Sequence, residues 1–559
     1  MKKLLLTMAF VVTFFAMSAV SASALANDTV KVGLRYGETA LFSANLENYT
    51  GSGYTFGYYD DDRVFVPVGT TSERAISMTA AGDIYLGADG TYNDTMVTGN
   101  DLYLGPWHVQ VDGLATYEDA LMAAEQLGGY PAWIDFGYAV RIGSFATPEE
   151  ATSYAEALGG GTVVQSSSTG IVVTVSRTDR ILFEFDCSGV LSLGVMPDGQ
   201  GEEAVTWFKG YRYPGGFEYP RVTGGNLHVY NVVGLESYVK GVIPYEMNNS
   251  WPMAALEAQA VCARTYACRT SKHLSAYGFD VCNTTDCQVY YGYSGNGSNG
   301  PNARTNAAVD NTCGQLLYYM GEMVQNAVYH SSNGGATEDV ANVWGSVRGY
   351  LVGKEDPYEA QTSIPNYNWT VTYTADELTR ILSEKGYSIG RVKDVAVSEY
   401  TPMGNVKKIT FVGTGGTKTV SGETCRTIFY SSSLGKSVKS MRFGINGSMP
   451  SGEKAVYYIN GENNTVNTLE GVSVLSGSGM LGKLGGDSFT VLTSSGTTKI
   501  ENTGTGRPSV NKQDGVFVIE GVGSGHNLGM SQYGARAMAE LGYTYQEILQ
   551  FYYTDITIE

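Results

Sequence analysis

Short segments in which apolar and polar residues alternate recur along about the first 240 residues, and Gly, Asn and Asp separate them. Examples are the segments 30–34, 64–68 and 181–185. Such alternation predicts half-buried strands joined by tight turns. Composition agrees, because 71 of the 559 residues are Gly and only 16% are charged. The pattern, together with the helical segments described below, predicts an α+β, strand-rich protein.

The charge balance limits the partners of the chain. It has 36 Lys and Arg against 55 Asp and Glu, a net charge of −19. Binding to phosphate backbones draws on clustered cations, so we expect no nucleic-acid partner. At 43% hydrophobic, the chain has enough apolar residues for real cores. Low charge with many Gly and Tyr residues favours an exported wall protein.

The first 26 residues have the pattern of a secretory signal. Lys2 and Lys3 precede an apolar run over 4–20, and Ala24-Leu25-Ala26 follows. We predict a signal peptide at 1–26, with cleavage before Asn27 and a secreted protein in the cell wall. The alternative is an uncleaved membrane anchor, because about 17 apolar residues approach the lower limit for spanning a bilayer.

An internal repeat lies at 105–178. Alternating segments at 107–111 and 138–145 are each followed by a helical pattern, and a last strand is predicted at 170–175. This arrangement predicts a small βαββαβ sandwich and resembles a SPOR domain. That resemblance implies binding to peptidoglycan glycan strands without stem peptides, through Gln110 and Arg141. The alternative is a generic strand–helix–strand module.

The rest of the chain has a different character. We assign 27–104 to a strand-rich N-terminal region and 180–559 to a large mixed α/β domain, with a β-rich insertion at 444–515. The clearest helix follows Trp251-Pro252 and is rich in Ala over 254–267. A second helix is predicted at 375–385.

Three segments carry residues that ordinary packing does not explain. In the first, Glu246 lies between an apolar run read as a strand and the start of the Ala-rich helix. Partial burial there raises the pKa of a carboxyl group toward a useful acid/base range, while a nearby helix N-terminus opposes the shift. The alternative is a solvated loop Glu.

The other two segments are 328–335 and 521–535. The first combines His330 with clustered hydroxyls and a Gly pair, which suits hydrogen bonding to sugars, although a lone His is often structural. The second is a Gly-rich loop with His526 and Gln532 before a helix. Its Gly spacing does not fit a dinucleotide fingerprint, so it indicates backbone shaped closely around another ligand.

Together these segments resemble the SpoIID/LytB family. The resemblance includes Gly241-Val242-Ile243-Pro244-Tyr245-Glu246-Met247, and its parts follow the family order at 235–247, 251–252, 254–267, 287–290, 330–335 and 524–535. It implies a lytic transglycosylase that cleaves the MurNAc-GlcNAc bond of denuded strands to 1,6-anhydro-muramyl ends, in sporulation or wall remodelling. The catalytic residue of the family falls on Glu246. The implied substrate-binding residues are Tyr245, Arg264, Gln288, Tyr329, His330, Ser331, Ser332, His526, Ser531, Gln532 and Tyr533.

Two other readings remain. One is a non-catalytic wall-binding protein that activates an N-acetylmuramoyl-L-alanine amidase, and both it and the enzyme imply a cell-wall amidase as partner. The other is a purely structural surface protein, which leaves the three segments unexplained.

The chemistry of a transglycosylase requires no cofactor, but some members of the resembled family hold zinc in the region of 273–287. His273, Cys282 and Cys287 are three such ligands here, and Asp286 offers a fourth. A Cys282–Cys287 disulfide and free thiols are the alternatives. The seven cysteines are an odd number, so at least one is free or pairs between molecules.

Overall fold

The computed structural model describes residues 28–99, 101–221, 224–294, 300–447 and 515–559, together with short strands between 457 and 501. The predicted signal peptide at 1–26 lies outside the described residues, as does most of the predicted insertion at 444–515. The protein is strand-rich and α+β, with several sheets, as predicted. None of the described helices has the length and apolar character needed to cross a membrane.

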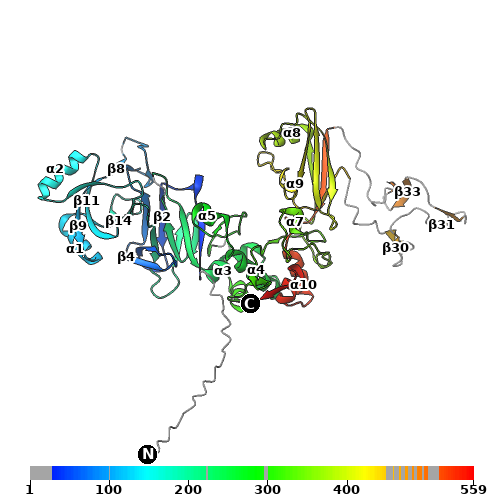
Figure 1. The fold of residues 1–559 in the computed structure, drawn as a ribbon, viewed down its shortest axis with the longest axis horizontal. Coiled ribbons are helices and arrows are strands. Elements are labelled where there is room, and N and C mark those ends of the chain that lie inside the picture. Colours follow the sequence, from blue (N-terminus) through cyan, green and yellow to red (C-terminus); the bar gives the residue numbers. More distant parts are fainter. Residues whose placement is uncertain are drawn as a thin grey trace, which may run out of the picture.

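The N-terminal half is a sandwich of two sheets (Figure 1). The rings of Phe56 and Phe183 stack across it at 5.1 Å, and apolar side chains from both sheets fill one core. The seven-stranded sheet has the order β20-β1-β19-β18-β15-β3-β4 and the ten-stranded sheet the order β12-β9-β11-β10-β14-β13-β5-β2-β16-β17. The sandwich elements outside the predicted repeat are β1 (Thr29–Arg35), η1 (Gly37–Thr39), β2 (Ser43–Asn48), β3 (Tyr54–Tyr59), β4 (Phe65–Thr71), β5 (Ala75–Ala80), β13 (Ile171–Val175), β14 (Ile181–Asp186), β15 (Leu193–Pro197), β16 (Val205–Phe208), β17 (Tyr211–Pro214), β18 (Gly216–Tyr219), β19 (Val229–Gly234) and β20 (Val281–Cys282). A separate three-stranded sheet is formed by β6 (Ile84–Leu86), β7 (Tyr92–Asn93) and β8 (Leu102–Leu104).

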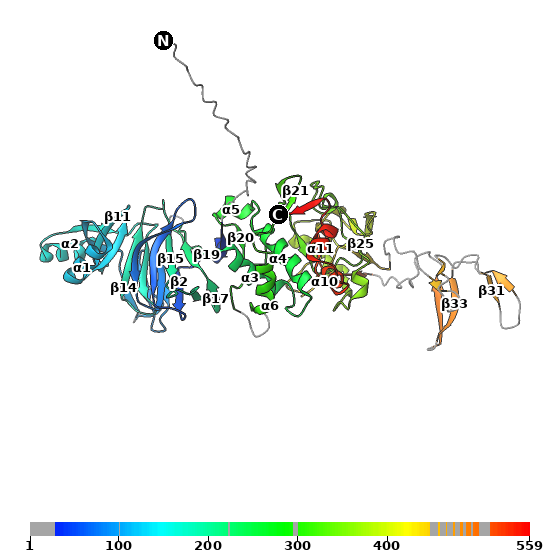
Figure 2. The ribbon, with the colours of Figure 1, turned by 90° about the horizontal axis from the view of Figure 1, so that it is seen from below.

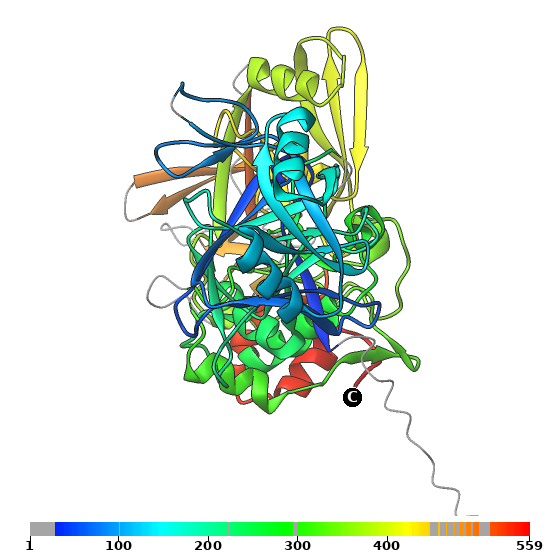
Figure 3. The same ribbon diagram turned by 90° about the vertical axis from the view of Figure 1, so that its left-hand side faces the viewer.

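The predicted repeat forms a βαββαβ unit at one end of the ten-stranded sheet. Thr116 and Thr147 cap its two helices, and the helices cover one face of the strands (Figure 3). Its elements are β9 (Trp107–Leu114), α1 (Tyr117–Leu127), β10 (Tyr130–Ile134), β11 (Gly137–Phe145), α2 (Pro148–Leu158) and β12 (Thr162–Gln165).

Two features of this unit differ from the sequence reading. The strand predicted to close it, β13, pairs instead with β14 and β5 of the sandwich. β10 pairs in parallel with β14, so this unit shares one continuous sheet with strands before residue 104 and after residue 178. Alternation within each segment could not reveal which strands become neighbours.

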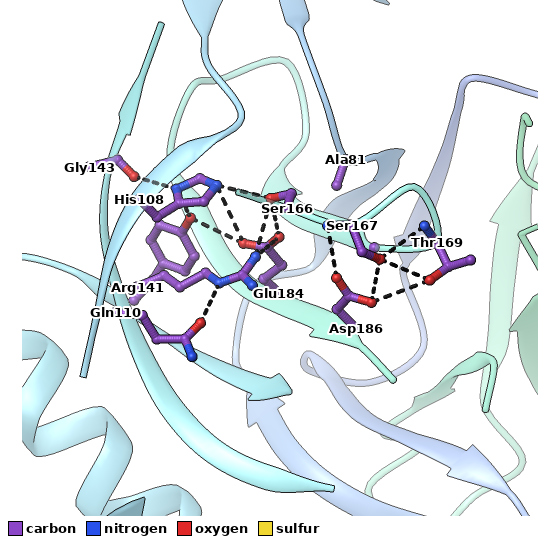
Figure 4. Close-up of polar contacts among 12 residues, drawn as sticks. Ala81, His108, Gln110, Arg141, Gly143, Ser166, Ser167, Thr169, Glu184 and Asp186 are labelled. Carbon is purple, nitrogen blue, oxygen red and sulfur yellow. Dashed lines mark hydrogen bonds and ion pairs between the residues drawn. The ribbon is translucent and has the colours of Figure 1, made fainter. Parts of the chain in front are cut away.

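A buried polar network lies where the unit joins the sandwich (Figure 4). Arg141 is 3% exposed and forms an ion pair with the fully buried Glu184 of β14. Gln110 Oε1 accepts a hydrogen bond of 3.1 Å from Arg141 Nε, and His108 Nε2 lies 4.0 Å from Glu184 Oε2. Burial alone would raise the pKa of Glu184, but Arg141 and His108 hold it below its ordinary value. Gln110 and Arg141, predicted to bind glycan, are thus buried in an internal network.

The centre of the molecule is helical (Figure 2). α4 packs against α3, α6, α10 and α11, and twelve of its residues are buried. It is therefore buried nearly all round, and it begins after Pro252, as predicted. The elements here are α3 (Leu235–Glu246), α4 (Met253–Ala267), α5 (Lys272–Tyr277), α6 (Ala303–Asn311), β21 (Leu317–Tyr319), β22 (Glu322–Met323), β23 (Tyr329–His330), α7 (Val340–Val343), η3 (Glu359–Gln361), β36 (Met530–Ser531), α10 (Gln532–Glu540), α11 (Tyr545–Tyr552) and β37 (Ile556–Ile558).

A second β unit, here called the inserted unit, comprises residues 368–447 and 515–522. It has its own hydrophobic core, and α8 confirms the helix predicted at 375–385. Its elements are β24 (Asn368–Thr374), α8 (Ala375–Glu384), β25 (Val392–Tyr400), β26 (Val406–Gly413), β27 (Thr417–Ser421), α9 (Thr424–Thr427), β28 (Phe443–Ile445) and β35 (Val516–Val522). Between β28 and β35 lie the hairpins β29 (Tyr457–Tyr458) with β30 (Thr465–Val466), β31 (Ser473–Leu475) with β32 (Leu481–Lys483), and β33 (Ser488–Thr493) with β34 (Gly496–Glu501).

We expect Arg141→Ala to lower the free energy of unfolding by about 3–5 kcal/mol, because it leaves Glu184 buried without its cation. Urea denaturation followed by far-UV circular dichroism measures this loss. The double variant Arg141→Met/Glu184→Leu removes both charges and should lose much less. A loss below about 1 kcal/mol for the single variant, the value typical of exposed pairs, would contradict this role.

Candidate active site

A groove of about 550 Å³ lies between the helical centre and the inserted unit. It brings together six of the predicted catalytic and substrate-binding residues: Glu246, Tyr329, His330, Ser331, His526 and Gln532. Its other lining residues are Tyr266, Thr285, Asp286, Cys287, Val289, Val328, Trp344, Glu423, Arg426, Ser524 and Gly525. The sequence reading did not single out Trp344, Glu423 or Arg426, because they lie in segments without a recognisable motif.

Glu246 is the last residue of α3. The apolar run before it was read as a strand, but it is helical, with Pro244 in its last turn. A short buried run has no polar face, so periodicity does not separate helix from strand. The Glu246 carboxyl accepts hydrogen bonds of 3.3 Å from the backbone N–H of Val289 and from Gln532 Nε2.

A chain of buried polar side chains stands behind this carboxyl group. Tyr238 donates to Gln288 Oε1 at 3.0 Å, and Gln288 Nε2 donates to the hydroxyl of Tyr329 at 3.1 Å. Tyr329 in turn hydrogen-bonds to Glu246. Gln288, predicted to contact substrate, is 1% exposed and acts through Tyr329 instead.

Burial raises the pKa of Glu246, and the hydrogen bonds from Val289, Tyr329 and Gln532 only partly oppose this shift. Its position at the C-terminal end of α3 disfavours the carboxylate as well, since the helix dipole is negative there. The raised pKa favours the protonated form, which is what a general acid requires.

The hydroxyl-rich loops are held by a carboxylate that sequence reasoning missed. Glu359 of η3 is 1% exposed and accepts hydrogen bonds from Ser332 Oγ at 2.8 Å, from the backbone N–H of Asn333 at 2.6 Å and from Ser531 Oγ. Ser332 and Ser531 were predicted to bind substrate, but both are buried against Glu359 rather than lining the groove. No motif surrounds Glu359, so only the three-dimensional contacts identify it.

The two histidines of the groove are uncharged at neutral pH. Burial lowers the pKa of both His330 and His526 to about 3. The neighbouring His526 lowers the pKa of His330 further, and the Arg426 guanidinium lowers that of His526. His330 Nδ1 contacts Leu528 O at 2.9 Å, while its Nε2 has no hydrogen-bond partner in the described part of the chain. A neutral ring nitrogen with free capacity suits a polar, uncharged ligand.

The remaining predicted residues lie outside the groove lining. Arg264 is fully buried and forms two hydrogen bonds of 2.7 Å with Glu236, so it is structural. Tyr533 packs against Trp251 with ring centroids 4.9 Å apart, and Tyr245 hydrogen-bonds to Ser294 O. The presence of a residue in a family motif therefore does not show whether its side chain lines the groove.

A cluster of ligand atoms borders the groove. His273, Cys282, Asp286 and Cys287 each place one donor atom within 4.8 Å of the others. His273 Nε2 is buried without a hydrogen-bond partner among the described residues, although it lies 3.2 Å from Asp286 Oδ2. Two thiols, one imidazole and one carboxylate fit a four-coordinate zinc site. The two cysteines are not joined by a disulfide here.

Comparisons with known proteins find one family model and several relatives that match this chain. The model of the SpoIID family, described as a stage II sporulation protein, matches residues 223–319, which include Glu246 and the four ligand residues. The chain is 32% identical to the amidase enhancer of Bacillus subtilis (strain 168) over 57% of this chain and 40% of that protein. It is 31% identical to an uncharacterized protein of Brachyspira hyodysenteriae (strain ATCC 49526 / WA1), over 59% of this chain and 68% of that protein. Identity to the stage II sporulation protein D of B. subtilis is 27%, over 57% of this chain and 73% of that protein. The chain therefore spans less than half of the amidase enhancer.

We expect the purified protein to carry about one zinc ion per chain, because the four donors fit a closed tetrahedral site. Metal analysis by mass spectrometry should show that Cys282→Ser and Cys287→Ser lose this zinc, while Cys313→Ser, at an exposed cysteine away from the cluster, retains it. Metal-free wild-type protein with a Cys282–Cys287 disulfide found by peptide mapping would contradict the zinc site.

Proposed function

The chain belongs to the SpoIID family, and we propose that it is a lytic transglycosylase that acts on denuded glycan strands of peptidoglycan. The observation that carries this proposal is Glu246, a carboxyl group with a raised pKa in a groove lined mostly by uncharged hydrogen-bonding and aromatic side chains. Such a lining suits a polysaccharide, whose hydroxyl and N-acetyl groups are polar and uncharged.

Glu246 performs both proton transfers in the proposed reaction. Its protonated carboxyl donates to the glycosidic oxygen between MurNAc and GlcNAc while the bond from that oxygen to C1 breaks. The resulting carboxylate accepts the proton of the muramyl 6-hydroxyl, whose oxygen bonds to C1. The product is a 1,6-anhydro-muramyl end, and no water is consumed. Gln532, Tyr329 and the Val289 N–H orient the carboxyl group.

The proposed reaction needs neither a second catalytic carboxyl group nor a catalytic metal ion. The reaction needs no second carboxylate to activate water, which is the arrangement of the two-carboxyl hydrolases. Bound at His273, Cys282, Asp286 and Cys287, zinc would supply a structural cross-link beside the groove. Cys287 lies two residues before Val289, so the cluster holds the segment that contacts Glu246.

A second function rests on a different observation. One relative is named an amidase enhancer, and it matches 57% of this chain. A wall-binding protein that activates an amidase would use the groove to hold glycan without cleaving it. Both functions place the protein in the cell wall with an amidase as partner, because an amidase produces strands without stem peptides.

We expect Glu246→Gln to reduce the rate by roughly 10²–10⁴-fold, the usual contribution of a general acid or base. The mature protein and the variant are incubated with amidase-treated and untreated peptidoglycan, and mass spectrometry detects anhydro-muramyl ends. Glu257→Gln, at a half-buried glutamate of α4 that lies outside the groove and accepts a hydrogen bond from Asn311, is the matched control and should retain activity.

Three outcomes would contradict the proposed activity in different ways. Reducing ends in place of anhydro ends would mean hydrolysis. Undiminished activity of Glu246→Gln would place the acid elsewhere. Binding to denuded strands without any soluble product would leave the amidase-activating function.

We expect the pH dependence of kcat/KM to report Glu246. The general acid must be protonated in the free enzyme, so kcat/KM falls as the pH rises through its pKa, and burial moves this fall above the ordinary range of a glutamate. Gln532→Leu removes a donor to the carboxylate, which raises the pKa further and should move the fall to higher pH. Gln165→Leu, at an exposed position of β12, is the control and should not move it. A shift to lower pH in Gln532→Leu would contradict the role of Gln532.

A further inference from the structure

A second pocket of about 470 Å³ lies on the inserted unit, next to the groove. Arg426 and Ser524 line both the pocket and the groove, so the two are contiguous. The pocket is lined by Lys385, Arg426, Thr427, Tyr430, Ser437, Val438, Lys439 and Ser524. The match to the SpoIID family model ends at residue 319, before all of these residues.

The pocket is positively charged in a protein whose net charge is −19. Three of its lining residues are cations, and none of the lining residues found in the described chain is acidic. Lys385 Nζ donates to Thr427 O at 3.2 Å, an uncharged partner. Arg426 is paired with Glu423 on its groove side, but its Nε is buried without a hydrogen-bond partner in the described ranges. Clustered cations with unused donors indicate an anionic ligand.

An aromatic side chain completes the pocket. Tyr430 is 58% exposed, although it follows the buried Phe429 of the second core. An exposed ring beside hydrogen-bonding hydroxyls offers an apolar face to one side of a sugar. The combination of cations and an exposed ring therefore fits an acidic saccharide better than a free anion.

We propose that this pocket is a second glycan subsite, which binds a muramyl residue of the same strand through its lactyl carboxylate. Arg426, Lys385 and Lys439 pair with the carboxylate, and Tyr430 packs against the sugar ring. The inference rests on the proposed function and adds a basis for its substrate selection. A stem peptide is attached to the lactyl group as an amide, so the carboxylate is charged only after an amidase has removed the peptide. The pocket thus recognises the group that distinguishes a denuded strand.

The test compares binding of three ligands to the Glu246→Gln protein, which leaves the strands intact. The ligands are denuded strands, the same strands with their lactyl carboxyls converted to methyl amides, and chitin oligomers, which lack the lactyl group. We expect adding Lys385→Ala and Lys439→Ala to weaken binding of denuded strands by about fivefold to tenfold, as for two exposed charge pairs. Binding of the other two ligands should be unchanged.

Controls separate this charge effect from misfolding. Lys393→Ala, at an exposed lysine of β25 outside the pocket, should bind all three ligands as the parent does. Both lysines of the pocket are exposed, so the thermal midpoint should not change. Tyr430→Ala should weaken all three ligands, because the ring contacts the sugar rather than the carboxylate.

Two results would overturn the inference: unchanged binding of denuded strands by the double lysine variant, or equal losses for charged and amidated strands. Neither depends on catalysis. If the wild-type protein forms no anhydro ends but the lysine variants still discriminate, the proposed activity fails and the subsite stands. If anhydro ends form without discrimination, the subsite alone fails.

Discussion

The carboxylate of Glu359 holds together the two loops that shape the groove. It accepts hydrogen bonds from 332–334 on one side and from Ser531 on the other, although these segments are about 200 residues apart in the chain. A buried carboxylate is costly unless its lone pairs are satisfied, so loosening either loop would leave a charge without partners. The pairing of β23 with β36, and hence the places of Tyr329 and Gln532 beside Glu246, depends on this contact.

Sequence reasoning found the features that depend on neighbouring residues. The two helical patterns of the repeat, the helix at 375–385 and the candidate carboxyl group Glu246 all have local signatures. It failed where distant segments decide the outcome. Arg141 is buried because it forms an ion pair with Glu184, from a strand outside the repeat. Arg264 likewise forms an ion pair with Glu236. The helix ending at Glu246 was misread because an apolar run buried on all sides has no diagnostic period.

The inserted unit is another feature that depends on contacts between segments far apart in the sequence. It leaves the helical centre before residue 368 and returns at 522, where the backbone enters the loop that carries His526. Asn527 in that loop has a φ of 64°, a left-handed conformation that Asn tolerates better than most residues. Its side-chain amide donates hydrogen bonds to Asn333 O and to Asn405 Oδ1, and so connects the helical centre to the inserted unit. In the inserted unit, Arg426 of α9 and the N-cap residue Glu423 line the groove.

The continuous ten-stranded sheet has a mechanical consequence. Modules joined by a flexible tether search their surroundings independently, and a pull on one barely affects the other. Here the βαββαβ unit shares backbone hydrogen bonds and a buried ion pair with the sandwich, so we expect the two to move as one rigid body. A force applied to the βαββαβ unit would therefore be transmitted through the sandwich to the helical centre, because the hydrophobic core of the sandwich continues into that of the centre.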